Sequence, residues 1–216
     1  MSKENQIKSK ERVRDKGEVF TNEREVNAML DLVKNETERI DSRFLEPACG
    51  SGNFLVEVLR RKLFVVKEKY KKSQTEYERN SLIALSSIYG VDIMEDNVED
   101  CRKRLLNIYS SEYTTLFKSK VNVQVLEVAE FMLEKNILCG DALTMLQTNG
   151  DPIVFAEWTA VNGVMMKRKD YTLAKLLESE NINSLPLFND LAEPVYIPKP
   201  IKEFPAKHYL RLAEDR

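Results

Sequence analysis

Histidine and cysteine are scarce in this sequence. Its 216 residues contain one histidine and three cysteines. Cys49, Cys101 and Cys139 have no Cys-x-x-Cys spacing, so they indicate neither a disulfide framework nor a zinc site. His208 lies near the C-terminal end with no evident partner, which argues against histidine-based acid–base or metal chemistry. We therefore expect no metal and a reduced, cytoplasmic setting.

Long hydrophobic runs and an excess of positive charge are also missing. No stretch reaches the length of a membrane span, and residues 1–14 lack the apolar core of a signal peptide. The chain has 33 basic and 35 acidic residues, a net charge of -2, so DNA contact would depend on local patches. Two basic runs, at 60–72 and 167–169, are either such patches or ordinary solvated surfaces.

The spacing of apolar residues predicts an α/β domain. Recurrences of three and four residues predict helices, at 22–33, 54–70, 76–87, 95–109 and 123–134. Short apolar runs predict strands between them, at 44–46, 88–92, 136–139 and 153–156. Because strands alternate with helices, we expect a parallel sheet with helices on both faces.

Composition divides the chain into three parts. Residues 1–16 form a polar N-terminal arm, and residues 17–183 the cofactor-binding domain. Residues 184–216 are rich in proline, which predicts an extended tail. We expect this tail to lie over the domain or a partner without contributing to the core.

The strongest pattern is the run EPACGSGNF at residues 46–54, where a strand leads through a small-residue turn into a helix. Gly50 and Gly52 remove the Cβ atoms that would keep a ligand away from the backbone, and the following helix offers free N–H groups. Such a turn lies at the carboxyl edge of the sheet, where this class of fold binds ligands. The third glycine of the dinucleotide fingerprint is missing, which favours a ligand without a pyrophosphate.

This run resembles motif I of adenine-specific (N6) DNA methyltransferases, the modification enzymes of restriction–modification systems. The resemblance implies a Rossmann-like S-adenosylmethionine-dependent methyltransferase fold, here in a form that lacks part of the family's pattern. It implies that S-adenosylmethionine binds along the turn, with Glu46 near its ammonium group. The turn residues assigned to the cofactor are Glu46, Ala48, Gly50, Gly52 and Asn53.

Three further segments resemble the family in the expected order. Asp92, at the end of a strand, corresponds to the acceptor for the ribose hydroxyls, with Ile93 against the adenine ring. The segment Cys139-Gly140-Asp141-Ala142 resembles the motif whose Asp accepts from the adenine amino group, so Asp141 and Ala142 are also assigned to the cofactor.

Upstream, Phe20 and Thr21 resemble a phenylalanine-threonine-proline segment that lies against the methionine part of the cofactor, although Asn22 replaces the proline. The order of this segment before motif I resembles modification subunits of type I systems and fused restriction–modification enzymes. The resemblance covers residues 17–143.

The family's catalytic tetrapeptide, Asn/Asp-Pro-Pro-Tyr/Phe, is absent. In the family it holds the flipped adenine in line with the methyl group and stacks on the base. Glu157 and Trp158 are weak candidates for a divergent site, as acceptor and stacking group. The alternative is a strand-end glutamate and a core tryptophan.

Three functions remain open from the sequence. The first is an adenine-N6 DNA methyltransferase that binds DNA and needs a protein partner for recognition or catalysis. The second is a non-catalytic, methyltransferase-like binding or regulatory module. The third, an RNA or protein methyltransferase, is disfavoured because the combined motifs look most like the DNA enzymes.

Overall fold

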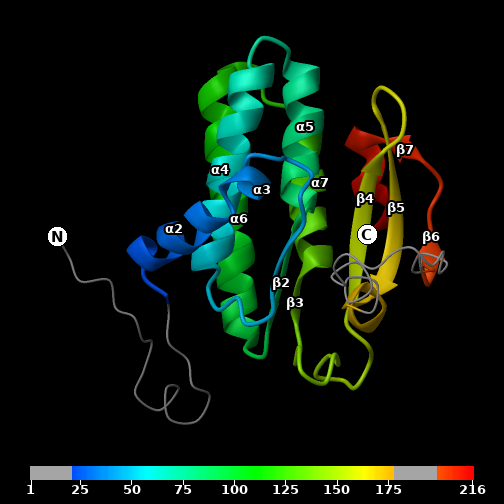
Figure 1. The fold of residues 1–216 in the computed structure, drawn as a ribbon. Helices are drawn as coiled ribbons and strands as arrows, with labels where there is room; N and C mark the ends of the chain where they lie inside the picture. Colours follow the sequence, from blue (N-terminus) through cyan, green and yellow to red (C-terminus); the bar gives the residue numbers. More distant parts are fainter. Residues whose placement is uncertain (1–20, 178–198) are drawn as a thin grey trace, which may run out of the picture.

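The computed structural model describes residues 21–177 and 199–216, which form a helical layer with a parallel sheet and a neighbouring antiparallel sheet (Figure 1). The first part contains α2 (Glu23–Leu32), α3 (Lys34–Thr37), β1 (Phe44–Glu46), α4 (Asn53–Tyr70), α5 (Gln74–Ser86), β2 (Ile88–Asp92), α6 (Glu95–Phe117), η1 (Lys118–Lys120), α7 (Val123–Asn136) and β3 (Ile137–Cys139). The second contains β4 (Val154–Ala160), β5 (Met165–Thr172), β6 (Lys202–Glu203), β7 (Lys207–His208) and η2 (Tyr209–Asp215).

The parallel sheet has the order β1-β2-β3. Leu45 lies opposite Tyr89 in the first pairing, and Asp92 lies opposite Cys139 in the second. The carboxyl ends of all three strands therefore lie at one edge. This mixed α/β arrangement confirms the predicted Rossmann-like class.

The two faces of the parallel sheet are covered differently. Helices α4 to α7 pack together on one face, where Ile88 belongs to the main hydrophobic core. Tyr89 and Val91 point to the other face, because successive side chains of a strand alternate. There they pack with Phe155 and Leu173, and residues 173–177 are helical. Helical segments thus lie on both faces, the longer ones on the α4 side.

The predicted fourth strand is not part of the parallel sheet. It is longer than expected, and β4 pairs antiparallel with β5 over its whole length, from Val154 opposite Thr172 to Ala160 opposite Met166. Only residues 161–164 join the two strands. A connection this short forces an antiparallel neighbour, since a parallel one needs a crossover of about a dozen residues or more.

The end of the chain is also different from the expected extended tail. Strands β6 and β7 both pair with β5. Tyr209 and Leu212 are buried in the main core, and the Tyr209 hydroxyl donates to Glu78 Oε2 at 2.6 Å. The expectation that the tail stays outside the core is therefore wrong for residues 199–216. The rest of the tail, up to residue 198, lies outside the described residues.

Candidate functional site

The turn between β1 and α4 has a backbone that requires glycine at two positions. Gly50 and Gly52 have φ values of 51° and 84°, in the left-handed region that other residues rarely adopt. A Cβ atom on Gly52 would lie 2.5 Å from Cys101 Sγ, so this turn is packed directly on α6. The N–H of Cys49 donates to Val91 O at 2.9 Å, which also fixes the turn to β2.

Asp92 links the turn to the end of β2. Its Oδ2 accepts from Gly50 N at 2.8 Å, and its Oδ1 accepts from Met94 N at 2.9 Å and from Asn97 Nδ2 at 3.2 Å. A carboxylate has about four acceptor positions. One position on Oδ2 therefore remains for a ligand, so Asp92 can accept one hydroxyl without losing a protein contact.

Glu46 is a half-buried acid, and one of its carboxylate oxygens has no partner among the described residues. Its Oε2 atom is inaccessible to solvent and has no hydrogen bond among the described residues. Burial, together with the nearby negative charge of Asp92, raises the pKa of Glu46 to about 8. A cationic group at this position would favour the ionised carboxylate and supply the missing contact.

Arg104 of α6 holds the other end of the turn. Its Nη1 donates to Ser51 O at 2.7 Å, to Ser51 Oγ at 3.0 Å and to Asn53 Oδ1 at 2.7 Å. The Asn53 side chain in turn donates to Thr21 O at 2.9 Å. Thr21 is thus brought to the turn as predicted from the sequence, whereas Phe20 lies outside the described residues.

The segment after β3 reaches the same edge of the sheet. The N–H of Gly140 donates to Asp92 O at 2.9 Å. Asp141 Oδ1 accepts from Leu143 N at 2.8 Å, so one of its oxygens closes a local turn. Ile93 is half exposed beside this edge, and Ala142 is partly buried. The structure therefore brings the described cofactor candidates together around three adjacent strand ends, with Ala48 exposed on the turn.

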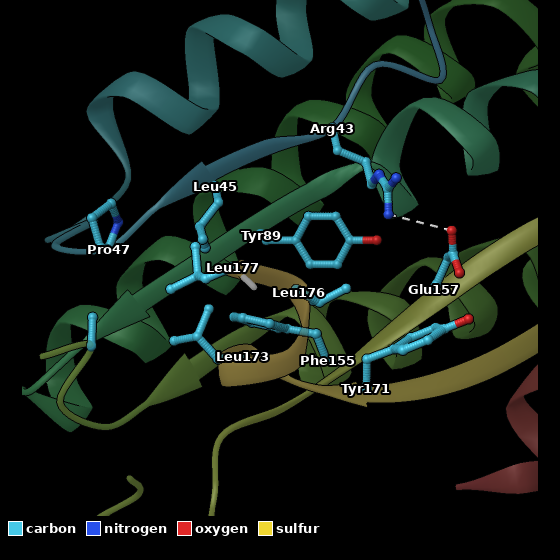
Figure 2. Close-up of a pocket in the computed structure, with 11 residues that line it drawn as sticks. Arg43, Leu45, Pro47, Tyr89, Phe155, Glu157, Tyr171, Leu173, Leu176 and Leu177 are labelled. Carbon is cyan, nitrogen blue, oxygen red and sulfur yellow. Dashed lines mark hydrogen bonds and ion pairs between the residues drawn. The ribbon is translucent and has the colours of Figure 1, made fainter. Parts of the chain in front are cut away.

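A separate cavity of about 420 Å³ runs along β1 on the side opposite Glu46 (Figure 2). Its lining is mostly apolar and aromatic, with Leu45, Tyr89, Phe155 and Leu173 on its walls. Figure 2 shows Pro47 at one end and the Arg43–Glu157 pair, joined by a contact of 3.4 Å, at the other. Of the proposed cofactor residues that the structure describes, Ala142 alone lines this cavity.

The two weak catalytic candidates are not brought together. Glu157 faces the cavity beside Arg43, whereas Trp158 is buried on the opposite face of β4, with its ring 5.8 Å from that of Phe131. Arg43 precedes β1 and Pro47 follows it, a separation of about 13 Å along an extended strand. Glu157 is therefore at the end of the cavity remote from the glycine turn. The position of Trp158 fits a core residue.

The two basic runs are largely compensated by acidic neighbours. In the first, Lys62 is buried, and Arg61 contacts Asp31 at 2.9 Å and Glu57 at 3.2 Å. In the second, the pairs are Lys167–Glu203, Lys169–Glu203 and Arg168–Asp170. This pairing favours their interpretation as ordinary surface and scaffold over DNA-contacting patches.

Sequence reasoning missed Arg104 and Asn97. A signal for Arg104 existed, because it follows Cys101 by three residues on α6 and therefore shares the face that packs on the turn. The contact itself joins residues 51 positions apart in the chain, which no local pattern reveals.

Residues 21–177 and 199–216 contain neither a cluster of metal ligands nor a membrane-spanning helix. No group of three or more His, Cys, Asp or Glu side chains in these ranges could hold a metal ion. None of the helices described there is long and apolar enough to cross a membrane.

Comparison with known proteins identifies the part of the chain that carries this site. Residues 15–150 match the family of the MmeI DNA-methyltransferase domain. A type II restriction enzyme and methyltransferase of Methanocaldococcus jannaschii is 34% identical over 107 residues, 47% of this chain and 8% of the relative. DNA methyltransferase A of Bacillus subtilis is 30% identical over 124 residues, 56% of this chain and 14% of the relative.

The matched region includes the glycine turn and all three strands of the parallel sheet. The chain spans only a small part, 8% and 14%, of these two relatives. No solved structure matches it. The resemblance to DNA methyltransferases of restriction–modification systems is confirmed, and the chain belongs to the family of the MmeI DNA-methyltransferase domain.

Proposed function

We propose that the protein binds S-adenosylmethionine at the carboxyl edge of the parallel sheet and acts in adenine-N6 methylation of DNA, within a restriction–modification system. The observation that carries this proposal is the unpaired, buried Oε2 of Glu46 beside the glycine turn. A buried carboxylate without a partner is costly for the fold, and an ammonium group offsets that cost. The cofactor's α-ammonium is such a group.

The other residues at the edge fit the remaining parts of this cofactor. Asp92 has one free acceptor position for a ribose hydroxyl. Ile93 offers an exposed apolar side chain for the adenine ring, and the second oxygen of Asp141 is available for an adenine N–H. When bound, S-adenosylmethionine supplies a methyl group activated by its sulfonium. The chain's own residues bind and orient it.

Methyl transfer to DNA needs more than this site. An acceptor cluster must hold the adenine amino group in line with the methyl group, and the sequence has no Asn-Pro-Pro-Tyr segment. Glu157 lies at the remote end of the cavity along β1, and the two basic runs are mostly paired. We therefore infer that a partner protein contributes to DNA recognition or catalysis.

A non-catalytic role is the second candidate. The missing tetrapeptide favours a module that binds the cofactor or assembles with a modification enzyme without transferring the methyl group. The cofactor edge would be the same in both cases, so cofactor binding alone does not distinguish the two functions.

Two measurements, made one after the other, test the proposal. Calorimetry of the purified chain should detect binding of S-adenosylmethionine or its demethylated product, and absence of heat and of a thermal shift at millimolar ligand would refute the cofactor site. Transfer of tritiated methyl groups to mixed genomic DNA should be weak with the chain alone. Strong turnover by the single chain would overturn the inferred need for a partner.

A further inference from the structure

We propose that Arg104 recognises the α-carboxylate of S-adenosylmethionine and makes the site selective for the amino-acid part of the cofactor. This inference rests on the proposed cofactor site and assigns to it a residue outside the sequence motifs. Arg104 lies on α6, half-buried against the glycine turn.

The hydrogen bonds of Arg104 all go to neutral groups. Its three acceptors are a backbone carbonyl, the Ser51 hydroxyl and the Asn53 amide oxygen, all neutral. No carboxylate forms an ion pair with it in the described parts of the chain. All three contacts use Nη1, so the N–H groups on Nη2 and Nε remain available for an anion.

Compensated arginines elsewhere in the protein provide a contrast. Arg168 donates from Nε and Nη2 to the two oxygens of Asp170, at 2.7 and 2.8 Å, and is buried with it. That geometry is the two-point contact that guanidinium groups make with carboxylates. Arg104 has the same donor pair free.

The neighbouring helix end favours an anion at the same place. Helix α4 begins at Asn53 and has no side-chain cap, so its first N–H groups add a partial positive charge. Glu46 lies before the turn, and Arg104 contacts Ser51 and Asn53 at its end. Among the described residues, an acid with one unpaired oxygen and a base without an acidic partner therefore flank one short loop, which matches the ammonium and carboxylate groups of an amino acid.

Three related ligands separate this role from a purely structural one. S-adenosylmethionine carries both the ammonium and the carboxylate, its decarboxylated form carries only the ammonium, and 5′-methylthioadenosine carries neither. Calorimetry should find that Arg104→Gln weakens binding of S-adenosylmethionine about tenfold, with less than about a twofold change for the other two ligands. Arg104→Lys should recover part of the loss, because it retains the charge.

Control variants define the outcomes. Glu46→Gln should weaken the two ammonium-bearing ligands and leave 5′-methylthioadenosine unchanged, and Lys103→Gln, at an exposed neighbouring position paired with Glu99, should change none. A parallel loss of all three ligands in both Arg104 variants would mean that Arg104 only holds the loop, and would overturn the proposal. If the parent chain binds none of the ligands, the proposed function itself fails.

Discussion

The parallel sheet with its glycine turn and the antiparallel sheet next to it differ in whether their charged side chains have oppositely charged partners. In the antiparallel part, several charged groups are paired: Arg168 with Asp170, Lys167 with Glu203, and Lys207 with Asp215. In the turn at the parallel sheet, Glu46 has an oxygen without any partner, and Arg104 contacts only neutral acceptors.

This difference indicates which charges serve the fold and which serve a ligand. A buried ionisable group without a partner is costly to ionise, so its retention needs a reason outside the folded chain itself. At the turn, the proposed zwitterionic ligand would supply that reason. In the antiparallel sheet, the pairs named above join residues of the chain to each other, and their role is structural.

Breaking the buried pair should have the largest effect on stability. Arg168→Met removes one partner and leaves Asp170 buried without its counter-charge, and it also removes the guanidinium from above the Phe204 ring. We expect the free energy of unfolding to fall by about 3–5 kcal/mol. Urea denaturation measures this. A change below about 1 kcal/mol would show that the pair contributes little, and would weaken the comparison.

Asp92 serves both the fold and the proposed ligand, since it has protein partners and one free acceptor position. Asp92→Ala should lower the free energy of unfolding by about 1–3 kcal/mol, because Gly50 N and Met94 N lose their acceptor. It should also weaken S-adenosylmethionine binding by about 1–3 kcal/mol. Asp141→Ala is the matched control and should weaken S-adenosylmethionine binding less than Asp92→Ala does. Parent-like binding in both variants would contradict the assignment of these strand ends.

Glu46→Gln should stabilise the ligand-free protein in a pH-dependent way. The pKa of Glu46 is about 8 in the folded chain against an ordinary value of 4.5. Between these values the folded form holds a proton that the unfolded form has lost, so stability falls as pH rises from the unfolded pKa toward the folded one and levels off above it. The variant cannot ionise, so it should be clearly more stable than the parent at pH 8.5 and differ little from it near pH 5.

Denaturation at both pH values, with the exposed Glu127→Gln as control, measures the pH effect of Glu46. A gain of equal size at both values would show that the effect of the substitution does not come from ionisation. A loss of stability at pH 8.5 would indicate that Glu46 has a partner in solution.

The smallest effect is expected at an exposed pair of the antiparallel part. Glu203 contacts Lys167 at 2.6 Å and Lys169 at 3.9 Å, and all three side chains are substantially exposed. Glu203→Gln should change stability by no more than the error of a denaturation experiment, since solvent screens such pairs. A clear loss would mean that exposed pairs also contribute to the scaffold.

The parallel sheet could be predicted from the sequence because its signals are local. The turn at 46–54, the strand ending at Asp92 and the segment around Asp141 each carry their own pattern, and parallel strands place such ends at one edge. The helix predicted at 22–33 is α2, and Asn22 caps its start, with Oδ1 accepting from Glu25 N at 3.0 Å.

The remaining features depend on contacts between distant residues. The apolar run at 153–156 does not reveal which strand it pairs with, whereas the short link at 161–164 accounts for its antiparallel pairing with β5. The burial of Tyr209 depends on Glu78, 131 residues earlier. Arg104 likewise acquires its role only when α6 packs on the turn. Proline content alone suggested a tail outside the core, and this was wrong because a few apolar side chains suffice to anchor a short segment.

The packing of Cys101 beneath Gly52 gives the protein a built-in chemical reporter. Cys49 and Cys101 are buried at the turn, whereas Cys139 is partly accessible. Hydrogen bonding to Cys101 and burial raise the pKa of the Cys49 thiol, which slows its reaction further. A thiol reagent should therefore modify Cys139 first, and the other two only when the turn opens. The labelling rate of Cys49 and Cys101 would measure how often the turn opens, and a ligand that holds the turn closed would slow that labelling.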